Sequence, residues 1–473
     1  MSLHFLPAMI ISITILILLL AIALKRAHNL AYVITGLGLI GAFFSQCILL
    51  YLPNSSDGLF AFSPVSSLLS LLMLSILIFL WLQLYAWLAK QKGHKEEFYL
   101  LLLLVSLGAL GMIVSEHFAS FFLTLELMSL SFVGLIAYSQ DKPVSQEAGI
   151  KYLVLSAVAS AFILMGIAIL YLQTGSLAFE QVTNEVSSSS SIPLLSTTGI
   201  IFILIGLFFK LSMVPCHLWV ADIFQGAPLP STALLSTISK LASFVVLWKM
   251  FNLGGWQHDH IILEIIGLVA VASMLIGNLL ALLQNNILRI LAFSSISHFG
   301  YLLILLLLFN QDADLLENAE FPLEALIFYL SAYLITLTGT FTVLMQLEGK
   351  TKLEQLTGLF WTRPLHAASL SVLMLSLAGI PLTIGFMGKF YLVTATISNQ
   401  VLWPLPFLVI ASVIGLFFYL RIIMVMLSSI NQVERSSAST TGERASLWFI
   451  IAVVMGLGTF PAFFAEIIKH TVR

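Results

Sequence analysis

GIIFILIGLFFKLSM, residues 199–213, is an apolar run with a single lysine, Lys210, near its end. Three other apolar runs carry or adjoin an ionisable side chain in the same way: residues 233–248 contain Lys240, residues 373–387 precede Lys389, and residues 121–138 contain Glu126. A lysine at the centre of a bilayer costs roughly 2.5–3.5 kcal/mol. Four such charges therefore indicate a function, and the movement of ions or protons fits them best.

The composition is that of a membrane protein. Of 473 residues, 60% are hydrophobic and 9% are charged, and the mean hydropathy is +1.06. Soluble domains carry about 25% charged residues. Because a transmembrane helix needs about 20 mainly apolar residues, the sequence predicts an all-α polytopic protein in the lipid bilayer. It has about fourteen spans, centred near residues 13, 41, 76, 105, 128, 160, 206, 240, 271, 298, 334, 379, 412 and 457.

Charge and cysteine usage exclude several functions. The net charge of −2 says nothing about nucleic acid, but no basic cluster resembles a DNA-binding patch, so no nucleic-acid partner is expected. Cys47 and Cys216 cannot hold an iron–sulfur cluster, and no dinucleotide-binding or P-loop motif is present. The apolar N-terminus has no early basic region or cleavage site, so it is expected to be retained as the first span.

The basic residues predict the orientation in the membrane, because cytoplasmic loops are rich in Lys and Arg. The loops after odd-numbered spans hold Lys25, Arg26, Lys90, Lys92, Lys95, Lys142, Lys151, Arg289, Lys350, Lys352, Arg363, Arg421, Arg435 and Arg444. The opposite side holds only Lys249, Lys469 and Arg473, and the polar connector at residues 187–191 lies there too. Both termini are therefore expected to face away from the cytoplasm.

A weak internal repeat predicts two inverted five-helix units. LELMSLSFVG at residues 125–134 aligns with LAFSSISHFG at 291–300, and GLFFK ending at Lys210 aligns with GFMGK ending at Lys389. Five spans are an odd number, so the copies cross in opposite senses, as in many transporters. The predicted parts of this single membrane domain are residues 1–95 with three spans, a first repeat at 96–255, a second at 256–430, and a last span at 431–473.

Two spans are predicted to be broken next to a lysine. Pro215 follows Lys210, and Gly379, Pro381, Gly385 and Gly388 precede Lys389. Proline removes a backbone hydrogen bond, which lipid tolerates only where the backbone lines a protein or hydrated cavity. Ordinary helix kinks are the alternative.

Polar residues follow one face in three spans. They are Thr232, Ser236, Ser239 and Ser243 beside Lys240; Ser294, Ser297, His298 and Tyr301; and Tyr329, Tyr333, Thr336 and Thr340. Each hydroxyl can also bond a carbonyl of its own helix. Three such faces with a lysine and a histidine favour the wall of a hydrated path.

Four segments resemble the antiporter-like membrane subunits of respiratory complex I. They are TLELMSLSFVGLIAY (124–138), EAGIKYLVLSAVASAF (147–162), KLSMVPCHLWVADIFQGAPLPSTALLSTISK (210–240) and LRILAFSSISHFGY (288–301). The resemblance covers essentially the whole chain. It matches Glu126, Lys210, Lys240 and Lys389 to the family's charged residues, and His217 to its histidine after the first break. Cys216 stands where an aromatic residue is expected.

The resemblance implies a proton-translocating subunit of a bacterial NADH:quinone oxidoreductase, embedded in the inner membrane. It also implies that this chain holds no cofactor, and that flavin, iron–sulfur clusters and quinone belong to partner subunits. The alternatives are a subunit of a multi-subunit cation/proton antiporter or of a membrane-bound hydrogenase. Buried lysines disfavour the antiporter, because they repel Na⁺. A scaffold without transport is disfavoured by the cost of unused buried charge.

A mechanism follows from elementary electrostatics. A buried lysine releases its proton more readily than one in water, and a nearby carboxylate opposes that release. Glu126 is expected to hold Lys210 charged, with Lys240 accepting the proton and Lys389 passing it on. Because Ala292 replaces the glutamate in the second repeat, the halves are not equivalent. His298 is either a relay or a core histidine, and Asp222 and Arg289 either fix local structure or open the cytoplasmic side.

Overall fold

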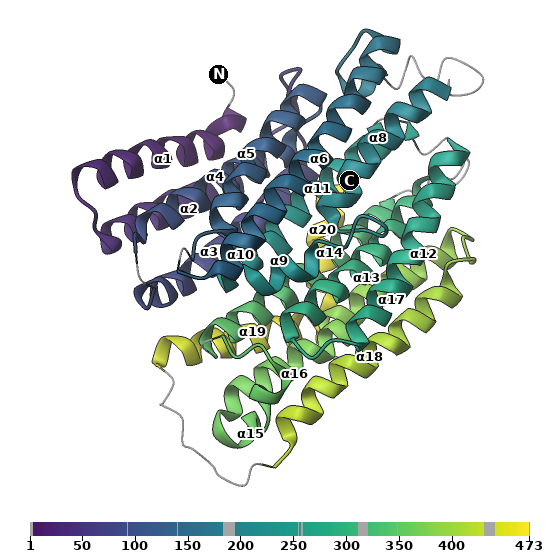
Figure 1. The fold of residues 1–473 in the computed structure, drawn as a ribbon. Helices are drawn as coiled ribbons and strands as arrows, with labels where there is room; N and C mark the ends of the chain where they lie inside the picture. The colour runs from purple at the N-terminus through teal and green to yellow at the C-terminus, as the bar shows by residue number, and fades with distance from the viewer. Residues whose placement is uncertain are drawn as a thin grey trace. The chain divides into compact units, whose positions relative to one another are not determined.

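The computed structural model describes residues 3–472 apart from 92, 140, 183–193, 254, 257–258, 311–319, 348 and 430–439. Within these residues, thirteen helices are long and apolar enough to cross a membrane (Figure 1). Two shorter apolar helices, α16 (Pro364–Ala378) and α17 (Ile384–Ser398), occupy the place of the span predicted near residue 379. The predicted all-α polytopic fold is therefore confirmed.

The chain divides into two compact units, each described here by itself. The first comprises Met1–Leu211 and Gly226–Glu264. Its helices are α1 (Leu6–Leu24), α2 (His28–Leu49), α3 (Pro64–Ala89), α4 (Glu96–Val114), α5 (Phe118–Ile136), α6 (Pro143–Thr174), α8 (Leu194–Leu211), α10 (Leu229–Leu234) and α11 (Lys240–Leu253). A small antiparallel hairpin joins β1 (Ser55–Ser56) to β2 (Ala61–Phe62).

The second unit comprises Ser212–Gln225 and Ile265–Arg473. It holds most of α9 (Val220–Gly226) and of α12 (His260–Leu282), followed by α13 (Ile287–Leu306), α14 (Glu320–Gln346), α15 (Leu359–Thr362), α16, α17, α18 (Leu405–Leu427), α19 (Thr441–Thr459) and α20 (Pro461–Val472). α14 packs against α13, α16, α17, α19 and α20. α13 and α14 are almost completely buried, so they form the core of this unit.

Close helix packing in the first unit depends on small residues. α6 and α8 lie side by side, and a Cβ added to Gly206 of α8 would meet the Ala159 carbonyl of α6 at 2.8 Å (Figure 1). Gly199, two turns earlier on the same face, approaches Gly166 in the same way. Small residues let membrane helices come together without a hydrophobic driving force. Lys210 lies one turn beyond Gly206, so this packing directs its side chain toward α6.

Both predicted breaks are present, and their lysines lie on opposite sides of them. α8 ends at Leu211, directly after Lys210, and Ser212 has φ +62°. α16 ends at Ala378, Gly379 has φ +84°, and Lys389 lies within the following helix, α17. The repeat had predicted equivalent places for the two lysines. A positive φ interrupts a right-handed helix, which frees carbonyl groups that polar side chains can bind.

The end of the chain differs from the single predicted span near residue 457. α19 ends at Thr459, and the separate helix α20 begins at Pro461, because proline cannot continue a helix hydrogen-bond ladder. Phe464 of α20 packs edge-on against Phe328 of α14. Lys92, Arg435, Arg473 and the connector at residues 187–191 lie outside the described residues. The four predicted parts of the chain and the inverted repeat stay predictions.

Candidate functional site

Lys210 lies in the first unit with its ammonium enclosed by hydroxyl groups. The side chain is 2% exposed. Its Nζ donates to Ser129 Oγ of α5 at 2.6 Å and to Ser156 Oγ of α6 at 2.7 Å. The Tyr152 ring centre lies 5.8 Å from Nζ. These polar groups offset part of the cost of removing the charge from water.

Glu126 of α5 is hydrogen-bonded to α6, the helix that also provides a partner for the Lys210 ammonium. Its carboxylate accepts a hydrogen bond from the Ser160 hydroxyl of α6, and the side chain is partly exposed. Among the described residues, no ion pair within 4.0 Å joins Glu126 to Lys210. Glu126 and Lys210 are therefore linked indirectly, through the hydroxyls of Ser160 and Ser156, which lie one turn apart on α6.

Lys240 follows an irregular turn that the sequence did not predict. Residues Leu235–Ser239 form a π-helix, η2, between α10 and α11, and Lys240 begins α11 at 1% exposure. Thr237 donates to the Ala233 carbonyl at 2.6 Å, and Ser236 donates to the same carbonyl at 3.0 Å. A π-helical turn inside an α-helix is rare and is frequent at functional sites.

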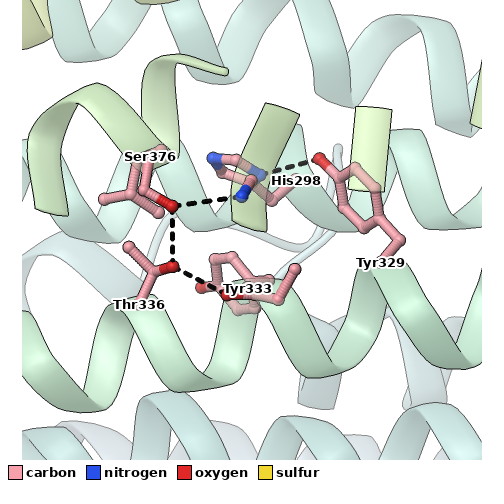
Figure 2. A pocket seen from close by; sticks show the side chains of 8 residues that line it. His298, Tyr329, Tyr333, Thr336 and Ser376 are labelled. Atoms are coloured by element: carbon pink, nitrogen blue, oxygen red, sulfur yellow. Dashed lines mark hydrogen bonds between the residues drawn. The ribbon is translucent and has the colours of Figure 1, made fainter. Parts of the chain in front are cut away.

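His298 lies in the core of the second unit and lines a small cavity. Figure 2 shows the ring between Tyr329 and Ser376. The Nδ1 atom lies 2.8 Å from Tyr329 Oη, and the Nε2 atom lies 3.3 Å from Tyr419 Oη. Thr336 and Ser376 are hydrogen-bonded at 3.0 Å on the cavity wall. Polar side chains of α13, α14 and α16 line this cavity.

Lys389 binds the end of the helix that precedes it. Its Nζ donates to the Ala378 carbonyl at 2.8 Å, and the Tyr301 ring centre lies 5.5 Å away. The last carbonyls of a helix carry partial negative charge and lack intrahelical partners. Gly379 permits this approach, because a Cβ there would lie 2.7 Å from Lys389 Cδ.

The segment after the break at Lys210 carries His217 and Asp222, and Arg289 of α13 contacts it. His217 is 7% exposed, and its Nδ1 has no hydrogen-bond partner among the described residues. Arg289 donates to Asp222 at 2.8 Å and to Gln225 at 3.2 Å within the second unit. Asp222 is about half exposed, so this pair fixes the short helix α9 to α13 at a solvated position.

Hydroxyl groups on the three predicted polar faces donate to backbone carbonyls, and two of them also contact side chains of other helices. Thr232, Ser236, Ser294 and Thr340 donate to carbonyls of their own helices, as in the alternative given above. Ser297 and Thr336 also donate to carbonyls of their own helices, each at 2.7 Å, and in addition Ser297 lies 3.1 Å from the Asn278 amide oxygen and Thr336 lies 3.0 Å from the Ser376 hydroxyl. These two hydroxyls connect helices.

The sequence analysis did not single out the residues that hold Lys210 and Glu126. Tyr152, Ser156 and Ser160 recur four residues apart and are buried, whereas Leu153, Leu155 and Val158 of the same helix are exposed. The periodicity used for the other faces would have found them. Among the described residues, no group of three or more His, Cys, Asp or Glu side chains could hold a metal ion.

Comparisons of sequence place the chain among known membrane subunits. The family model of the NADH:quinone oxidoreductase/Mrp antiporter transmembrane region matches residues 115–415. NADH-quinone oxidoreductase subunit N of Shewanella woodyi is 74% identical over 473 residues, with 100% of each chain covered. The subunit N of Ectopseudomonas mendocina is 38% identical, covering 98% of this chain and 95% of its own.

Comparisons of structure agree with this placement. A chain of respiratory complex I from Thermus thermophilus with bound aureothin superposes with a TM-score of 0.82 at 26% identity, covering 97% of this chain and 98% of that one. A chain of the Mrp complex from Dietzia sp. has a TM-score of 0.86 at 21% identity, covering 100% and 97%, which shows the fold alone. The chain therefore belongs to the NADH:quinone oxidoreductase/Mrp antiporter family of membrane subunits, in the group named NADH-quinone oxidoreductase subunit N.

Proposed function

We propose that this chain is the proton-translocating membrane subunit of an NADH:quinone oxidoreductase and carries out no redox chemistry itself. Electron transfer from NADH to quinone takes place in partner subunits, which hold the flavin and the iron–sulfur clusters. This chain uses the released free energy to move protons. The full-length similarity to proteins named subunit N supports the assembly, and the buried charges support the role.

The arrangement around Lys210 is the observation that carries this proposal. Hydroxyl groups hold its ammonium. Glu126, the residue that matches the family's glutamate, is held separately by Ser160. The attraction of Glu126 for the ammonium then varies with small movements of either side chain. An approach of the carboxylate keeps the proton on Lys210, and its withdrawal releases that proton.

Proton transfer continues through residues that each unit holds in its interior. We assign Lys240 as the next acceptor and Lys389 as the donor toward the exit. His298, with two tyrosine hydroxyls in contact, is a relay in the second unit, and His217 is a further relay candidate. A neutral lysine accepts a proton and an ammonium donates one, so each lysine returns to its initial state after one transfer.

The chain is assigned to the bacterial inner membrane as a multi-pass protein with both termini on the periplasmic side. The distribution of basic loop residues supports this orientation. The domain is treated as three N-terminal spans (1–95), two inverted repeats (96–255 and 256–430) and a last span (431–473). No cofactor or metal is assigned to this chain.

The experiment is to purify the assembly from native membranes through a tag on this chain and to assay it after reconstitution. Flavin and iron–sulfur subunits should co-purify, and NADH oxidation by quinone should drive proton uptake in vesicles. The variant Lys210→Ala should keep the assembly intact and lose coupled proton uptake. Sodium-dependent transport without co-purifying flavin would instead identify an antiporter subunit.

A further inference from the structure

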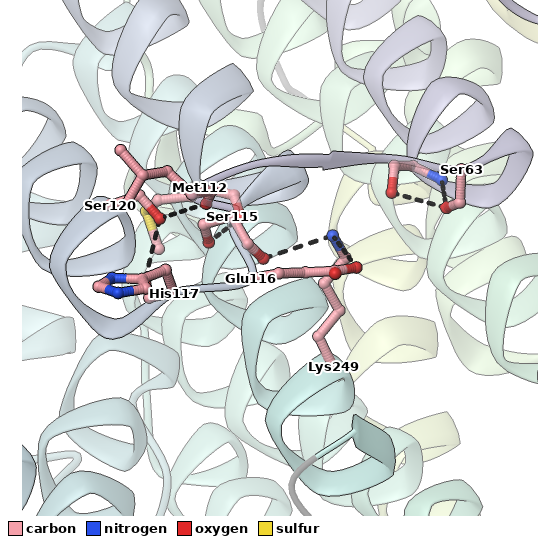
Figure 3. A network of polar contacts seen from close by, with 9 residues as sticks. Ser63, Met112, Ser115, Glu116, His117, Ser120 and Lys249 are labelled. Carbon is pink, nitrogen blue, oxygen red and sulfur yellow. Dashed lines mark hydrogen bonds and ion pairs between the residues drawn. The ribbon is translucent and has the colours of Figure 1, made fainter. Parts of the chain in front are cut away.

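A third lysine of the first unit is buried, although its sequence position had placed it at a span end. Lys249 lies near the end of α11 and is 4% exposed. Its Nζ lies 3.4 Å from the Ser115 carbonyl oxygen and 3.9 Å from Glu116 Oε1. Figure 3 shows the side chain reaching from α11 to the turn between α4 and α5. A buried lysine with one carboxylate nearby has the chemistry of a proton carrier.

The surrounding loops fix Glu116 opposite Lys249. The Glu116 amide donates to the Leu59 carbonyl at 3.2 Å, and the Glu116 carbonyl accepts from the Phe179 amide at 3.0 Å. The neighbouring residues Ser115 and His117 form isolated bridges with Phe60 and Ala178. Segments distant in sequence thus hold the backbone of Glu116 on both sides. Its side chain remains 33% exposed, so one carboxylate contacts both a buried ammonium and solvent.

We propose that Lys249 and Glu116 form a second proton-release site, which passes protons from Lys240 to the outer side of the membrane in parallel with the exit through Lys389. The Lys249 ammonium gives a proton to the Glu116 carboxylate and becomes a neutral amine. The carboxylic acid then releases that proton to outer water, and the amine accepts the next proton from the interior. A bridging water or a small rotation of the Glu116 side chain closes the 3.9 Å gap. This inference rests on the proposed function and on the proposed orientation.

The position of Lys249 along α11 suits transfer from Lys240. The two lysines are separated by about 13 Å along the helix, at 1.5 Å per residue. Ser243, one turn after Lys240, has a buried hydroxyl without a hydrogen-bond partner among the described residues. Such a hydroxyl can bond a water molecule.

The electrostatics of Glu116 also suit a carboxyl that exchanges protons. Burial raises the pKa of Glu116 above its usual value, the Lys249 charge lowers it, and Glu180 raises it. His117 is the adjacent titratable group. A carboxyl that is not held permanently ionised can accept a proton from its partner and pass it on.

The test uses NADH-driven proton uptake in inverted vesicles that carry the whole complex, normalised to assembled complex. Lys249→Arg is the decisive variant, because guanidinium keeps the positive charge and the ion pair but scarcely releases its proton. Glu116→Gln keeps the shape of the partner and removes its proton-accepting charge. The exposed Glu264, changed to Gln, is the matched control.

We expect Lys249→Arg and Glu116→Gln each to lower the rate of proton uptake by about twofold, because the exit through Lys389 remains. In a Lys389→Ala background, either change should slow the remaining uptake by about tenfold or more, as loss of a positioned proton-transfer group does. Glu116→Asp should restore part of the rate, and Glu264→Gln should leave it unchanged. Normal uptake in assembled Lys249→Arg or in Glu116→Gln would show that the pair is only a structural clamp and would overturn the inference. Lys210→Ala is assayed in parallel. If Lys210→Ala loses proton uptake while the Lys249 and Glu116 variants keep it, the inference fails and the proposed function stays intact.

Discussion

Ser156 accepts a hydrogen bond from the Lys210 ammonium, and Ser160, one turn later on α6, donates one to the Glu126 carboxylate. The two opposite charges are thus held by hydroxyls of a single helix. A direct ion pair would hold the two charges at a fixed distance. Separate hydroxyl partners allow the distance between the charges to change at lower cost, as a switched proton site requires.

Lys210→Ala should slow NADH-driven proton uptake about tenfold or more, because a positioned proton-transfer group is lost. Lys210→Arg should also impair uptake, since guanidinium scarcely deprotonates. Ser156→Ala should have a smaller effect, because Ser129 still accepts from the ammonium. Thr198→Ala is the control, since this exposed hydroxyl of α8 donates to the Leu194 carbonyl of its own helix. A normal proton-to-electron ratio in Lys210→Ala would contradict the assignment.

Glu126→Gln should reduce coupled activity while the complex assembles normally, because the amide keeps the shape of the side chain and removes its charge. Glu126→Asp should be milder. Glu147→Gln serves as the control. Glu147 forms an exposed ion pair with Lys151, one turn later on α6, at 2.7 Å, and exposed ion pairs contribute little to stability. Full proton uptake by the Gln variant would assign Glu126 a purely structural role.

Lys240→Ala and Lys389→Ala should block the same flux if the two lysines act in series. The double variant should then transport protons almost as fast as the slower single variant, because residues that act as a unit are strongly non-additive. The measurement is proton uptake by inverted vesicles of both single variants and the double variant. Series transfer is expected because Ala292 leaves the second half without a counterpart of Glu126. Losses that accumulate in the double variant would indicate two independent routes.

Gly379→Ala should displace Lys389 from the end of α16. The residue has φ +84°, and the added Cβ would lie 2.7 Å from Lys389 Cδ. The backbone conformation alone should cost about 1–2 kcal/mol, so both the melting temperature and the proton uptake should fall. Gly456→Ala in α19 is the matched control, because nothing lies within 4 Å of its added Cβ. Equal behaviour of the two variants would show that Lys389 does not depend on this close approach.

Lys249→Met should raise the pKa of Glu116 further, because it removes the charge that favours the carboxylate and leaves the effects of burial and Glu180. A hydrophobic carbodiimide reacts with protonated carboxyl groups, so labelling of Glu116 should persist to higher pH in this variant. Mass spectrometry of the labelled peptides gives the midpoint, with Glu264 as the internal reference. A midpoint that stays in place or moves to lower pH would show that Lys249 does not act on Glu116.

Hydropathy predicted most of the fold because lipid imposes a simple rule. A span must be long, apolar and helical to satisfy its backbone, and thirteen candidate spans lie where apolar runs predicted them. Gly379 and Pro381 likewise marked the break between α16 and α17, since both residues act through their own backbone. The π-helix before Lys240, where Ser236 and Thr237 both donate to the Ala233 carbonyl, left no such mark.

The sequence by itself determined the membrane class, the family and the ionisable residues within apolar spans, because each of these depends on local composition or on a contiguous motif. Only the tertiary structure decided which groups meet. Ser156 reaches Lys210 because glycines of α8 pack against α6, Ser160 of α6 reaches Glu126 of the neighbouring α5, and Lys249 reaches Glu116 across more than a hundred residues of chain. Such contacts depend on how helices pack, and a helix buried on every side, like α11, gives no periodic signal of which neighbour each side chain touches.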